Sequence, residues 1–331
     1  MITVTLFYRQ DCPECDQVEN DLNNLQGQFP HRLAKIDISA DAATNEKYAN
    51  RIPVVQIGPY KLEKSITQQD LQVALGAAQD RQSYLEKNDE EFQRRQIKGK
   101  TISGTDRFSL WVSNHYMWLF NFFVFLYVGL PFLAPVLMEE RLEAPAKVIY
   151  TIYSPLCHQL AFRSFFLFGK QPYYPRALAD ISGVVTYEQL TGNPKLDLLQ
   201  ARAFIGNDVT GYKVAICERD VAIYGSLLLF GVVFALTGRK IKSLPWYFWI
   251  VLGLIPIGLD GFSQLPSLAG WDFLSWLPIR ESTPFLRVLT GTLFGATTAW
   301  YLYPMIEESM RETHVMLVRK LAVVNQTQPK P

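Results

Sequence analysis

Long apolar runs without a charged residue are the feature that most constrains how this chain folds. Residues 116–138 form one such run, and its length suffices for a helix to cross a bilayer, which takes about 20 apolar residues. Residues 221–238, 243–259 and 288–306 are similar. Tryptophans near the ends of these runs resemble an aromatic belt at the two membrane surfaces. The pattern predicts a polytopic all-α membrane domain over residues 111–306, with four spans.

One further apolar segment, residues 148–168, is interrupted by polar or helix-breaking positions such as Pro155 and Arg163. It is either a fifth span or a re-entrant helix that dips into the interface. Cytoplasmic loops are enriched in Lys and Arg. With four spans, the basic clusters at 239–242 and 311–320 both fall on the cytoplasmic side, whereas a fifth span would put both outside. Four spans are therefore favoured, in a cell membrane, with the N-terminal domain in the cytoplasm.

The first third of the chain is different, because it is polar and mixed in charge. Its apolar residues alternate or recur at helical spacing in short blocks separated by turn residues. Strands are expected at 2–8, 32–38, 51–58 and 60–65, and helices at 16–25, 42–49 and 67–78. The predicted order is β-α-β-α-β-β-α, which defines an α/β domain over residues 1–78.

A Cys-Pro-Glu-Cys motif at residues 12–15 follows the first strand and opens the first helix. The helix dipole favours the thiolate form of a cysteine at a helix N-terminus, and Cys15, one turn further on, can resolve a mixed disulfide. The order of elements, this motif and an Ile-Pro-Val sequence at 52–54 resemble the glutaredoxin and thioredoxin fold. The resemblance implies a thioredoxin-like domain with Cys12 as nucleophile and Pro53 in a cis-proline loop.

The same resemblance makes glutathione a candidate reductant, although no set of glutathione-binding residues can be placed in this sequence. A protein that carries a thiol or disulfide is a candidate partner. A cysteine pair of this spacing is also half of a metal site, but the domain offers only His31 as a further ligand. Redox chemistry is therefore favoured over metal binding. The net charge of +1 gives no indication of nucleic-acid binding.

Two polar segments flank the predicted membrane domain. Residues 79–110 carry many charges of both signs and are predicted as a solvated helix and linker. Basic residues at its end stand just before the first span, as they do on the cytoplasmic side of membranes. Residues 307–331 are predicted as a cytoplasmic tail.

Polar and ionisable residues are few in the membrane domain, and they gather near the ends of the predicted spans. The start of the second span, the end of the third and the start of the fourth lie on one membrane face in any topology. Ionisable groups at membrane depth are costly and usually functional. The alternative is that these residues lie among the lipid headgroups, where Arg and Asp form ion pairs with a purely structural role. Gly291 and Gly295 provide a small-residue face for close helix packing. The candidate site residues are Cys157, His158, Gln159, Arg163, Ser164, Cys217, Arg219, Asp220, Tyr224, Asp260, Gln264 and Arg287.

Several of these residues stand in motifs that resemble an uncharacterised prokaryotic integral-membrane family. The motifs are Cys-His-Gln (157–159), Arg-Ser (163–164), Cys-x-Arg-Asp (217–220), Asp-Gly (260–261) and Arg-x-x-Thr-Gly (287–291). The resemblance covers roughly residues 145–306 and implies no settled activity. Here a long segment separates the two cysteine motifs, and some relatives have a second cysteine in place of Asp220.

Three functions remain open. The first is thiol–disulfide chemistry, in which the N-terminal dithiol exchanges with the membrane-domain cysteines or with a partner protein. The second is a zinc-dependent membrane enzyme that acts on a lipid-linked substrate and is regulated by the redox domain. The third is a non-enzymatic transporter or scaffold. It is disfavoured because four spans are few for a transporter and no internal repeat is visible. The lipid bilayer is a partner in all three. Candidate zinc ligands are Cys157, His158, Cys217, Asp220 and Asp260.

Overall fold

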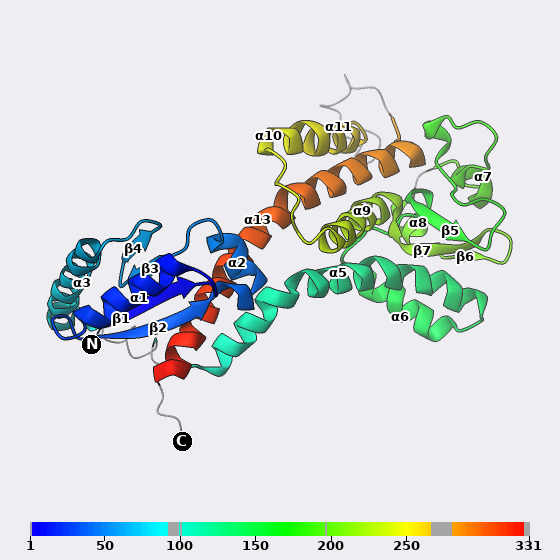
Figure 1. Cartoon of the computed structure of the whole chain (residues 1–331). Coiled ribbons are helices and arrows are strands. Elements are labelled where there is room, and N and C mark those ends of the chain that lie inside the picture. Colours follow the sequence, from blue (N-terminus) through cyan, green and yellow to red (C-terminus); the bar gives the residue numbers. More distant parts are fainter. Residues whose placement is uncertain (1, 92–98, 100, 196, 266–279, 328–331) are drawn as a thin grey trace. The chain divides into compact units, whose positions relative to one another are not determined.

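The computed structural model describes residues 2–91, 99, 101–195, 197–265 and 280–327, and the chain divides into two compact units (Figure 1). Unit 1 comprises residues 1–115 together with 308–331, and unit 2 comprises residues 116–307. The helices α5 (Gly104–Glu139) and α13 (Pro284–Thr327) contribute to both units, because the boundaries fall within them. Unit 1 is therefore built from two segments that are far apart in the sequence.

Unit 1 contains a mixed four-stranded sheet in the order β2-β1-β3-β4. Its strands are β1 (Ile2–Tyr8), β2 (His31–Asp37), β3 (Val54–Ile57) and β4 (Tyr60–Glu63). β1 pairs parallel with β2 and antiparallel with β3, and β3 pairs antiparallel with β4. Together with the helices described next, this sheet confirms the predicted β-α-β-α-β-β-α order and the α/β class.

Helices cover one face of this sheet because alternate residues of β1 and β3 are apolar. α1 (Pro13–Leu25) and α3 (Gln68–Asn88) lie against this face. α3 begins with a capping box between Thr67 and Asp70 and continues into the segment predicted as a charged linker. The core between sheet and helices includes Val4, Leu6, Val55, Val18, Leu22, Leu71 and Leu75.

The other face of the sheet is covered by α2 (Ala42–Tyr48), which follows the short 3-10 turn η1 (Ile38–Ala40), and by the last turns of α13. Val315 of α13 packs in the same cluster as Phe7 and Ile36 of the sheet. Polar contacts hold the helix in place, since His314 Nε2 lies 2.8 Å from an Asp41 carboxylate oxygen. Residues 308–327 thus form part of the fold of unit 1, whereas the sequence predicted a separate tail.

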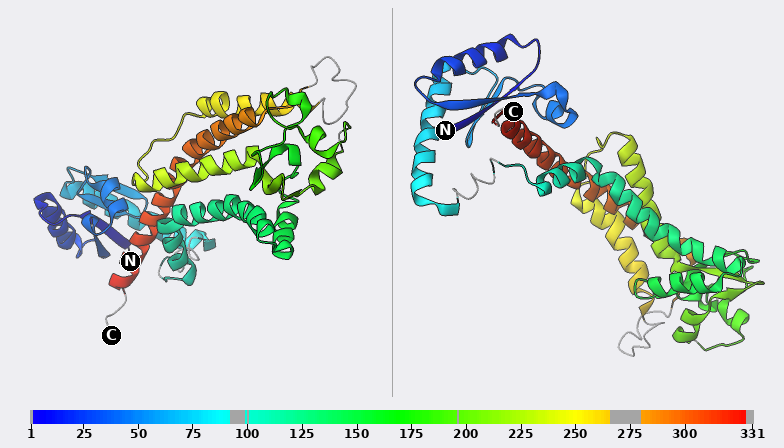
Figure 2. Two further views of the ribbon diagram at one scale, coloured as in Figure 1. Left: turned by 90° about the vertical axis from the view of Figure 1, so that its right-hand side faces the viewer. Right: turned by 90° about the horizontal axis from the view of Figure 1, so that it is seen from below.

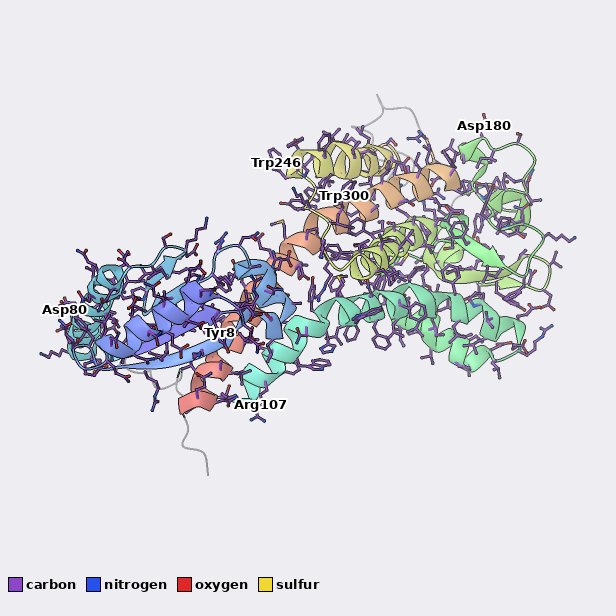
Figure 3. All side chains as sticks on the ribbon, in the orientation of Figure 1. Tyr8, Asp80, Arg107, Asp180, Trp246 and Trp300 are labelled. Carbon is purple, nitrogen blue, oxygen red and sulfur yellow. A yellow bond between two sulfur atoms is a disulfide. The ribbon has the colours of Figure 1, made fainter. Side chains whose placement is uncertain are left out.

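Unit 2 contains the apolar helices. Within the described chain, α5 and α9 (Glu218–Leu236) are long and apolar enough to cross a membrane. Only 28% and 17% of their most apolar windows are buried, so most of the side chains on these helices are half-buried or exposed (Figure 3). An outward-facing apolar surface is what contact with lipid requires.

Of the four predicted spans, two are thus supported and the other two are weaker. The third corresponds to a shorter apolar helix, which consists of α10 (Trp246–Phe248), the π-helical segment η4 (Trp249–Leu254) and α11 (Ile255–Phe262). The fourth corresponds to the first half of α13, where Thr, Gly and Tyr residues between 288 and 306 lower the hydropathy.

The prediction that this part of the chain is all-α was wrong, because unit 2 also contains a three-stranded antiparallel sheet. The order is β5-β7-β6, with β5 (Ser164–Leu167), β6 (Gly206–Asn207) and β7 (Gly211–Cys217). The 3-10 turns η2 (Ala161–Arg163) and η3 (Ala177–Ala179) and the helices α7 (Tyr187–Thr191) and α8 (Leu198–Ala203) lie in the same stretch. β5 and β6 are too short for an alternating pattern to be recognised, and β7 is buried along nearly its whole length, so its residues do not alternate.

The segment 148–168 is not a fifth span. α6 (Glu143–Tyr153) occupies only its first part, and a loop, η2 and β5 follow. A helix of 11 residues is about 16 Å long, which is too short for a hydrocarbon core of about 30 Å. The interruption by Pro155 and Arg163 therefore marks a change from helix to loop and strand.

α9 and α13 pack closely at Gly291 and Gly295, the two glycines predicted to form a small-residue face (Figure 2). A Cβ atom on Gly295 would lie 2.3 Å from the Ile223 carbonyl oxygen, and one on Gly291 would lie 2.8 Å from that of Arg219. Towards its other end, α13 meets the connection between α9 and α10, where Trp300 Nε1 donates to the Lys242 carbonyl (3.0 Å). The contacts at the start of α13 and the contact at Trp300 therefore involve different ends of α9.

Candidate functional site

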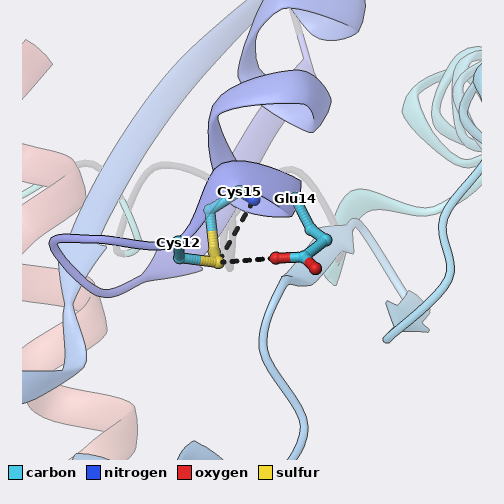
Figure 4. Close-up of a disulfide and its surroundings, with 3 residues drawn as sticks. All are labelled: Cys12, Glu14 and Cys15. Atoms are coloured by element: carbon cyan, nitrogen blue, oxygen red, sulfur yellow. Dashed lines mark hydrogen bonds between the residues drawn. A yellow bond between two sulfur atoms is a disulfide. The ribbon is translucent and has the colours of Figure 1, made fainter.

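The first candidate site is the cysteine pair at the start of α1. Cys12 and Cys15 form a disulfide with a Cα–Cα distance of 5.2 Å, and Cys12 is the N-cap residue of α1 (Figure 4). The Cys15 backbone N–H donates to Cys12 Sγ (3.2 Å). A carboxylate oxygen of Glu14 lies 4.0 Å from the same sulfur. Cys12 Sγ, the nucleophile that the resemblance implies, therefore lies at the positive end of the helix dipole. One negative side chain, that of Glu14, lies near it.

A cavity of about 340 Å³ opens beside this pair. Cys12 contributes to its wall, as does Pro53, and the Ile52–Pro53 peptide bond is cis, as the resemblance implied. Cys15 is 2% exposed and does not contribute to this wall. Two basic and two acidic side chains also line the cavity, namely Arg9, Lys64, Asp11 and Glu14. A substrate in this cavity would thus contact Cys12, whereas Cys15 is shielded from it.

The second candidate site lies in unit 2, where nine of the predicted residues line one cavity of about 530 Å³. They come from the loop after α6, from the start of α9, from the connection after α11 and from the start of α13. The parity of the predicted spans allowed Cys217, Asp220, Asp260, Gln264 and Arg287 to converge, and all of these except Asp260 line the cavity. The nine residues are Cys157, His158, Gln159, Arg163, Cys217, Arg219, Asp220, Gln264 and Arg287.

Two free cysteines and a carboxylate form the centre of this cavity wall. One ligand atom each of Cys157, Cys217 and Asp220 lies within 4.8 Å of the other two. Cys217 is the N-cap residue of α9, and the Asp220 backbone N–H donates to its sulfur (3.5 Å). The Cys217 backbone N–H donates to Cys157 Sγ (3.3 Å). Two sulfurs and one oxygen at this spacing suit a zinc ion with a fourth position left open.

Local backbone geometry brings Cys157 to this position. Gln159 has a positive φ of 52°, which turns the chain sharply two residues after Cys157. The Gln159 side chain is buried and donates from Nε2 to the Tyr150 carbonyl (2.8 Å). Lys213 Nζ donates to the Gln159 carbonyl (2.8 Å) and to the Arg202 carbonyl (2.6 Å). Gln159 is therefore a structural residue that fixes the cysteine loop to α6 and β7.

Three predicted residues do not contribute to this cavity wall. Ser164 is fully buried and donates to the Leu160 carbonyl (3.1 Å). Tyr224 packs against the Tyr127 ring, with centroids 4.3 Å apart. Asp260 accepts hydrogen bonds from Arg219 and from Ser282 Oγ, the latter at 2.8 Å.

Of the five candidate zinc ligands, two lie outside the cysteine cluster. His158 lines the cavity but is exposed, and Asp260 is engaged by its arginine and serine partners. Neither belongs to the group whose ligand atoms lie within 4.8 Å of one another. The candidate ligand set is thereby reduced to Cys157, Cys217 and Asp220.

A buried network of arginines and glutamates lies beside the cavity, and sequence reasoning missed its acidic members. Glu281 Oε1 accepts from Arg163 (2.6 Å) and Arg287 (2.6 Å), and Arg287 also donates to Glu218 (2.9 Å). The side chains of Arg287, Glu218 and Glu281 are at most 2% exposed. A signal for Glu281 was its position as a lone acid shortly before the fourth apolar run, and Glu218 stood within the Cys-x-Arg-Asp motif.

The pKa values of the two cysteines of unit 2 are shifted in opposite directions. The hydrogen bond with Cys217 lowers the pKa of the Cys157 thiol, although burial opposes this. The same hydrogen bond, reinforced by burial, raises the pKa of Cys217 well above its ordinary value. Burial also lowers the pKa of Lys213 to about 7. Cys157 is thus the sulfur that more readily loses its proton, and Cys217 is the hydrogen-bond donor.

The chain thus joins a thioredoxin-like α/β unit, which carries a Cys-x-x-Cys disulfide, to a unit of apolar helices. Residues 3–76 match the family described as glutaredoxin-like domain (DUF836), and residues 200–301 match the family described as predicted membrane protein (DUF2085). The chain thus has an N-terminal glutaredoxin-like domain and a C-terminal predicted membrane protein domain. The second match includes Cys217 and Arg287 but not the Cys-His-Gln motif at 157–159.

One curated relative is Uncharacterized protein MJ1492 of Methanocaldococcus jannaschii. It is 25% identical over 162 residues, which cover 48% of this chain and 69% of the relative. No solved structure matches this chain.

Proposed function

We propose that this chain is a membrane-bound thiol–disulfide oxidoreductase whose reactive dithiol is Cys12 and Cys15. The observation that carries the proposal is the disulfide at the N-terminus of α1, which opens through Cys12 on a cavity beside cis-Pro53. The glutaredoxin-like family match over residues 3–76 supports it. The substrate class is a protein or small-molecule disulfide.

The chemistry balances as a two-electron exchange. The Cys12 thiolate attacks one sulfur of the substrate disulfide, which forms a mixed disulfide and releases the first substrate thiolate. Cys15 loses its proton and attacks Cys12 Sγ, which releases the second substrate thiolate and leaves the Cys12–Cys15 disulfide. The substrate is reduced and the dithiol is oxidised. A thiol reductant, of which glutathione is one candidate, then restores the dithiol by the reverse exchange.

The proposal includes a topology with four spans, the N-terminal domain in the cytoplasm and the protein in the cell membrane. Charge supports it, because the basic residues at 239–242 and 311–320 then share the cytoplasmic face. In this topology Cys157 and Cys217 lie on the opposite face. About 30 Å of hydrocarbon then excludes direct exchange between the two cysteine pairs, so the partner of Cys12 is a cytoplasmic thiol or disulfide.

The test is a trapping experiment in cells that express the full chain. Cys15→Ser should accumulate a mixed disulfide with substrate, because Cys12 can attack but the resolving sulfur is missing. Cys12→Ser should trap nothing and should abolish reduction of a model disulfide by the purified protein. Equal trapping by both variants, or none by Cys15→Ser, would refute the assignment of roles.

A second candidate function is that of a zinc-dependent membrane enzyme, and the cluster of Cys157, Cys217 and Asp220 favours it. These residues would hold the ion, which would activate a water or polarise a substrate at its open position. Purified wild-type protein should then contain about one zinc per chain, and Cys217→Ser should contain much less. Cys12→Ser is the matched control, because it removes a cysteine from the other unit. Zinc content that is equal in wild type and Cys217→Ser excludes this site.

A further inference from the structure

We infer that the cavity beside Cys157 and Cys217 is a binding site for a phosphate-type anion carried by an amphiphile. We call it the arginine cavity, and it is the cavity of about 530 Å³ described above. The inference goes beyond thiol–disulfide exchange at Cys12, and it holds with or without a metal at the cysteine cluster. Three features support it: the charge of the wall, the way its arginines are held, and its apolar residues.

The wall of the arginine cavity is positively charged. Arg163, Arg219 and Arg287 all contribute to it, whereas Asp220 is its one carboxylate among the described residues. The three guanidinium groups come from three different parts of the chain, namely η2, the first turn of α9 and the first turn of α13. Their convergence on one cavity is therefore produced by the tertiary fold. Guanidinium groups match phosphate oxygens in both charge and geometry.

The carboxylates that hold these arginines lie outside the wall. Glu281 accepts from Arg163 and Arg287, and Asp260 accepts from Arg219, but neither acid lines the cavity. Arg287 is 2% exposed and therefore contributes mainly its charge, whereas the side chains of Arg163 and Arg219 are 19% and 21% exposed and can contact a ligand. A ligand oxygen in the cavity would meet guanidinium groups that these carboxylates already hold in place.

Apolar residues line the cavity together with the arginines. Leu156, Leu160, Leu198 and Leu265 contribute to it. A volume of about 530 Å³ falls in the range of small-ligand sites, and the cavity lies where the apolar helices α9 and α13 begin. A ligand with a phosphate-type head and an apolar body can contact the arginines and the leucines at the same time. A lipid headgroup and a soluble organic phosphate share this chemistry.

The test measures binding by the zinc-free full chain in detergent. Two probes are used, radioactive inorganic phosphate by equilibrium dialysis and dansyl-labelled phosphatidic acid by energy transfer from tryptophan. We expect saturable binding of at least one probe, weakened about tenfold or more (1.4 kcal/mol) by Arg219→Gln. Arg141→Gln is the matched control, because Arg141 is exposed and does not line the cavity. Binding of the lipid probe alone assigns a lipid, and binding of phosphate that phosphatidic acid does not displace assigns a soluble phosphate.

A second variant keeps the test decisive if loss of an arginine disturbs folding. Leu198→Glu adds a carboxylate to the wall at the first position of α8, where an acidic residue suits a helix. It should also weaken anion binding, whereas Leu199→Glu, at a neighbouring position that is 78% exposed and outside the wall, should not. Absence of saturable binding, or equal binding by wild type, Arg219→Gln and Leu198→Glu, overturns the inference. Disulfide reduction by the same samples reports the Cys12 function separately.

Discussion

Cys217 shows how much chemistry one residue position can combine. It ends β7, caps α9, donates a hydrogen bond to Cys157 and forms part of the arginine cavity. Its type and its place before an apolar run were enough to predict it as a site residue. The same is true of Cys12, because a cysteine at a helix start has few structural roles.

Other residues could not be identified in this way, since their role depends on partners far away in the sequence. Glu281 accepts a hydrogen bond from Arg163, which is 118 residues away in the sequence, and its position before the fourth apolar run does not reveal this partner or its burial. Lys213 stood in no predicted element or motif, yet it is fully buried and donates to two backbone carbonyls. Long-range pairing of this kind has no local signature.

Lys213 leads to a prediction about pH. Burial lowers its pKa to about 7 from an ordinary value of 10.5, so the unfolded chain binds this proton more tightly than the folded chain. The free energy of unfolding should therefore rise as the pH rises from about 7 towards 10, by at most about 1.4 kcal/mol per pH unit. The measurement is the Tm in detergent, followed by tryptophan fluorescence across this pH range.

The comparison that tests this prediction is Lys213→Met, which should lose most of this pH dependence. Lys195→Met, at an exposed lysine, should keep the slope of the wild type. Parallel slopes for wild type and Lys213→Met would show that other groups cause the dependence.

At the scale of elements, apolar runs predicted the helices well and the small sheet of unit 2 not at all. α5 and α9 are long enough for composition to identify them. β6 has two residues and β5 has four, and their partner β7 is buried along nearly its whole length, so no alternation appears. The elements of unit 1 were predictable because each strand or helix is bounded by turn residues.

The contact between α9 and α13 should be sensitive to side-chain volume. Gly295→Val should lower the stability of unit 2 by about 1–3 kcal/mol, because the new Cβ would lie 2.3 Å from a backbone oxygen of α9. Thermal unfolding in detergent measures this. Gly225→Ala is the control, since its Cβ would have no atom within 4 Å, and it should be close to neutral. A neutral result for Gly295→Val would mean that the two helices separate readily.

At the scale of the whole molecule, the sequence predicted two domains but missed how the chain closes unit 1. The segment 307–331 begins and ends with polar and charged residues, as expected of a tail, but residues 315–318 and 321–324 are apolar, a signal that the prediction of a tail left unused. The structure places Val315 in a core cluster with Phe7, Ile36 and Val54. The sheet has two apolar faces, and α2 is too short to cover the second one by itself.

This arrangement is tested by two neighbouring substitutions. Val315 is 4% exposed and Met316 is 62% exposed. Val315→Asp should destabilise unit 1 by more than about 3 kcal/mol, because it buries an unpaired charge, and Met316→Asp should change little. Proteolytic susceptibility of the glutaredoxin-like domain in the full chain reports the difference. Equal resistance of the two variants would contradict the packing described for α13.

The proposed topology is tested by labelling at two exposed positions of unit 2 (residues 140 and 240). Glu140→Cys lies in the connection after α5, and Lys240→Cys lies in the connection after α9. An impermeant maleimide applied to intact cells should label the first and not the second, because one span separates them. Labelling of the second alone would invert the topology, which would place Cys157 and Cys217 in the cytoplasm and Cys12 on the outer face.

The discontinuous construction of unit 1 also determines when the glutaredoxin-like domain is finished during synthesis. Phe7 and Ile36 leave the ribosome early, but Val315, which covers them, follows only after all the apolar helices have been made. Until then the part of this face that α2 leaves uncovered remains open to water and to other chains, which is the condition in which proteins bind chaperones or aggregate. The dithiol of Cys12 and Cys15 therefore acquires its complete scaffold only after the last apolar helix has been synthesised.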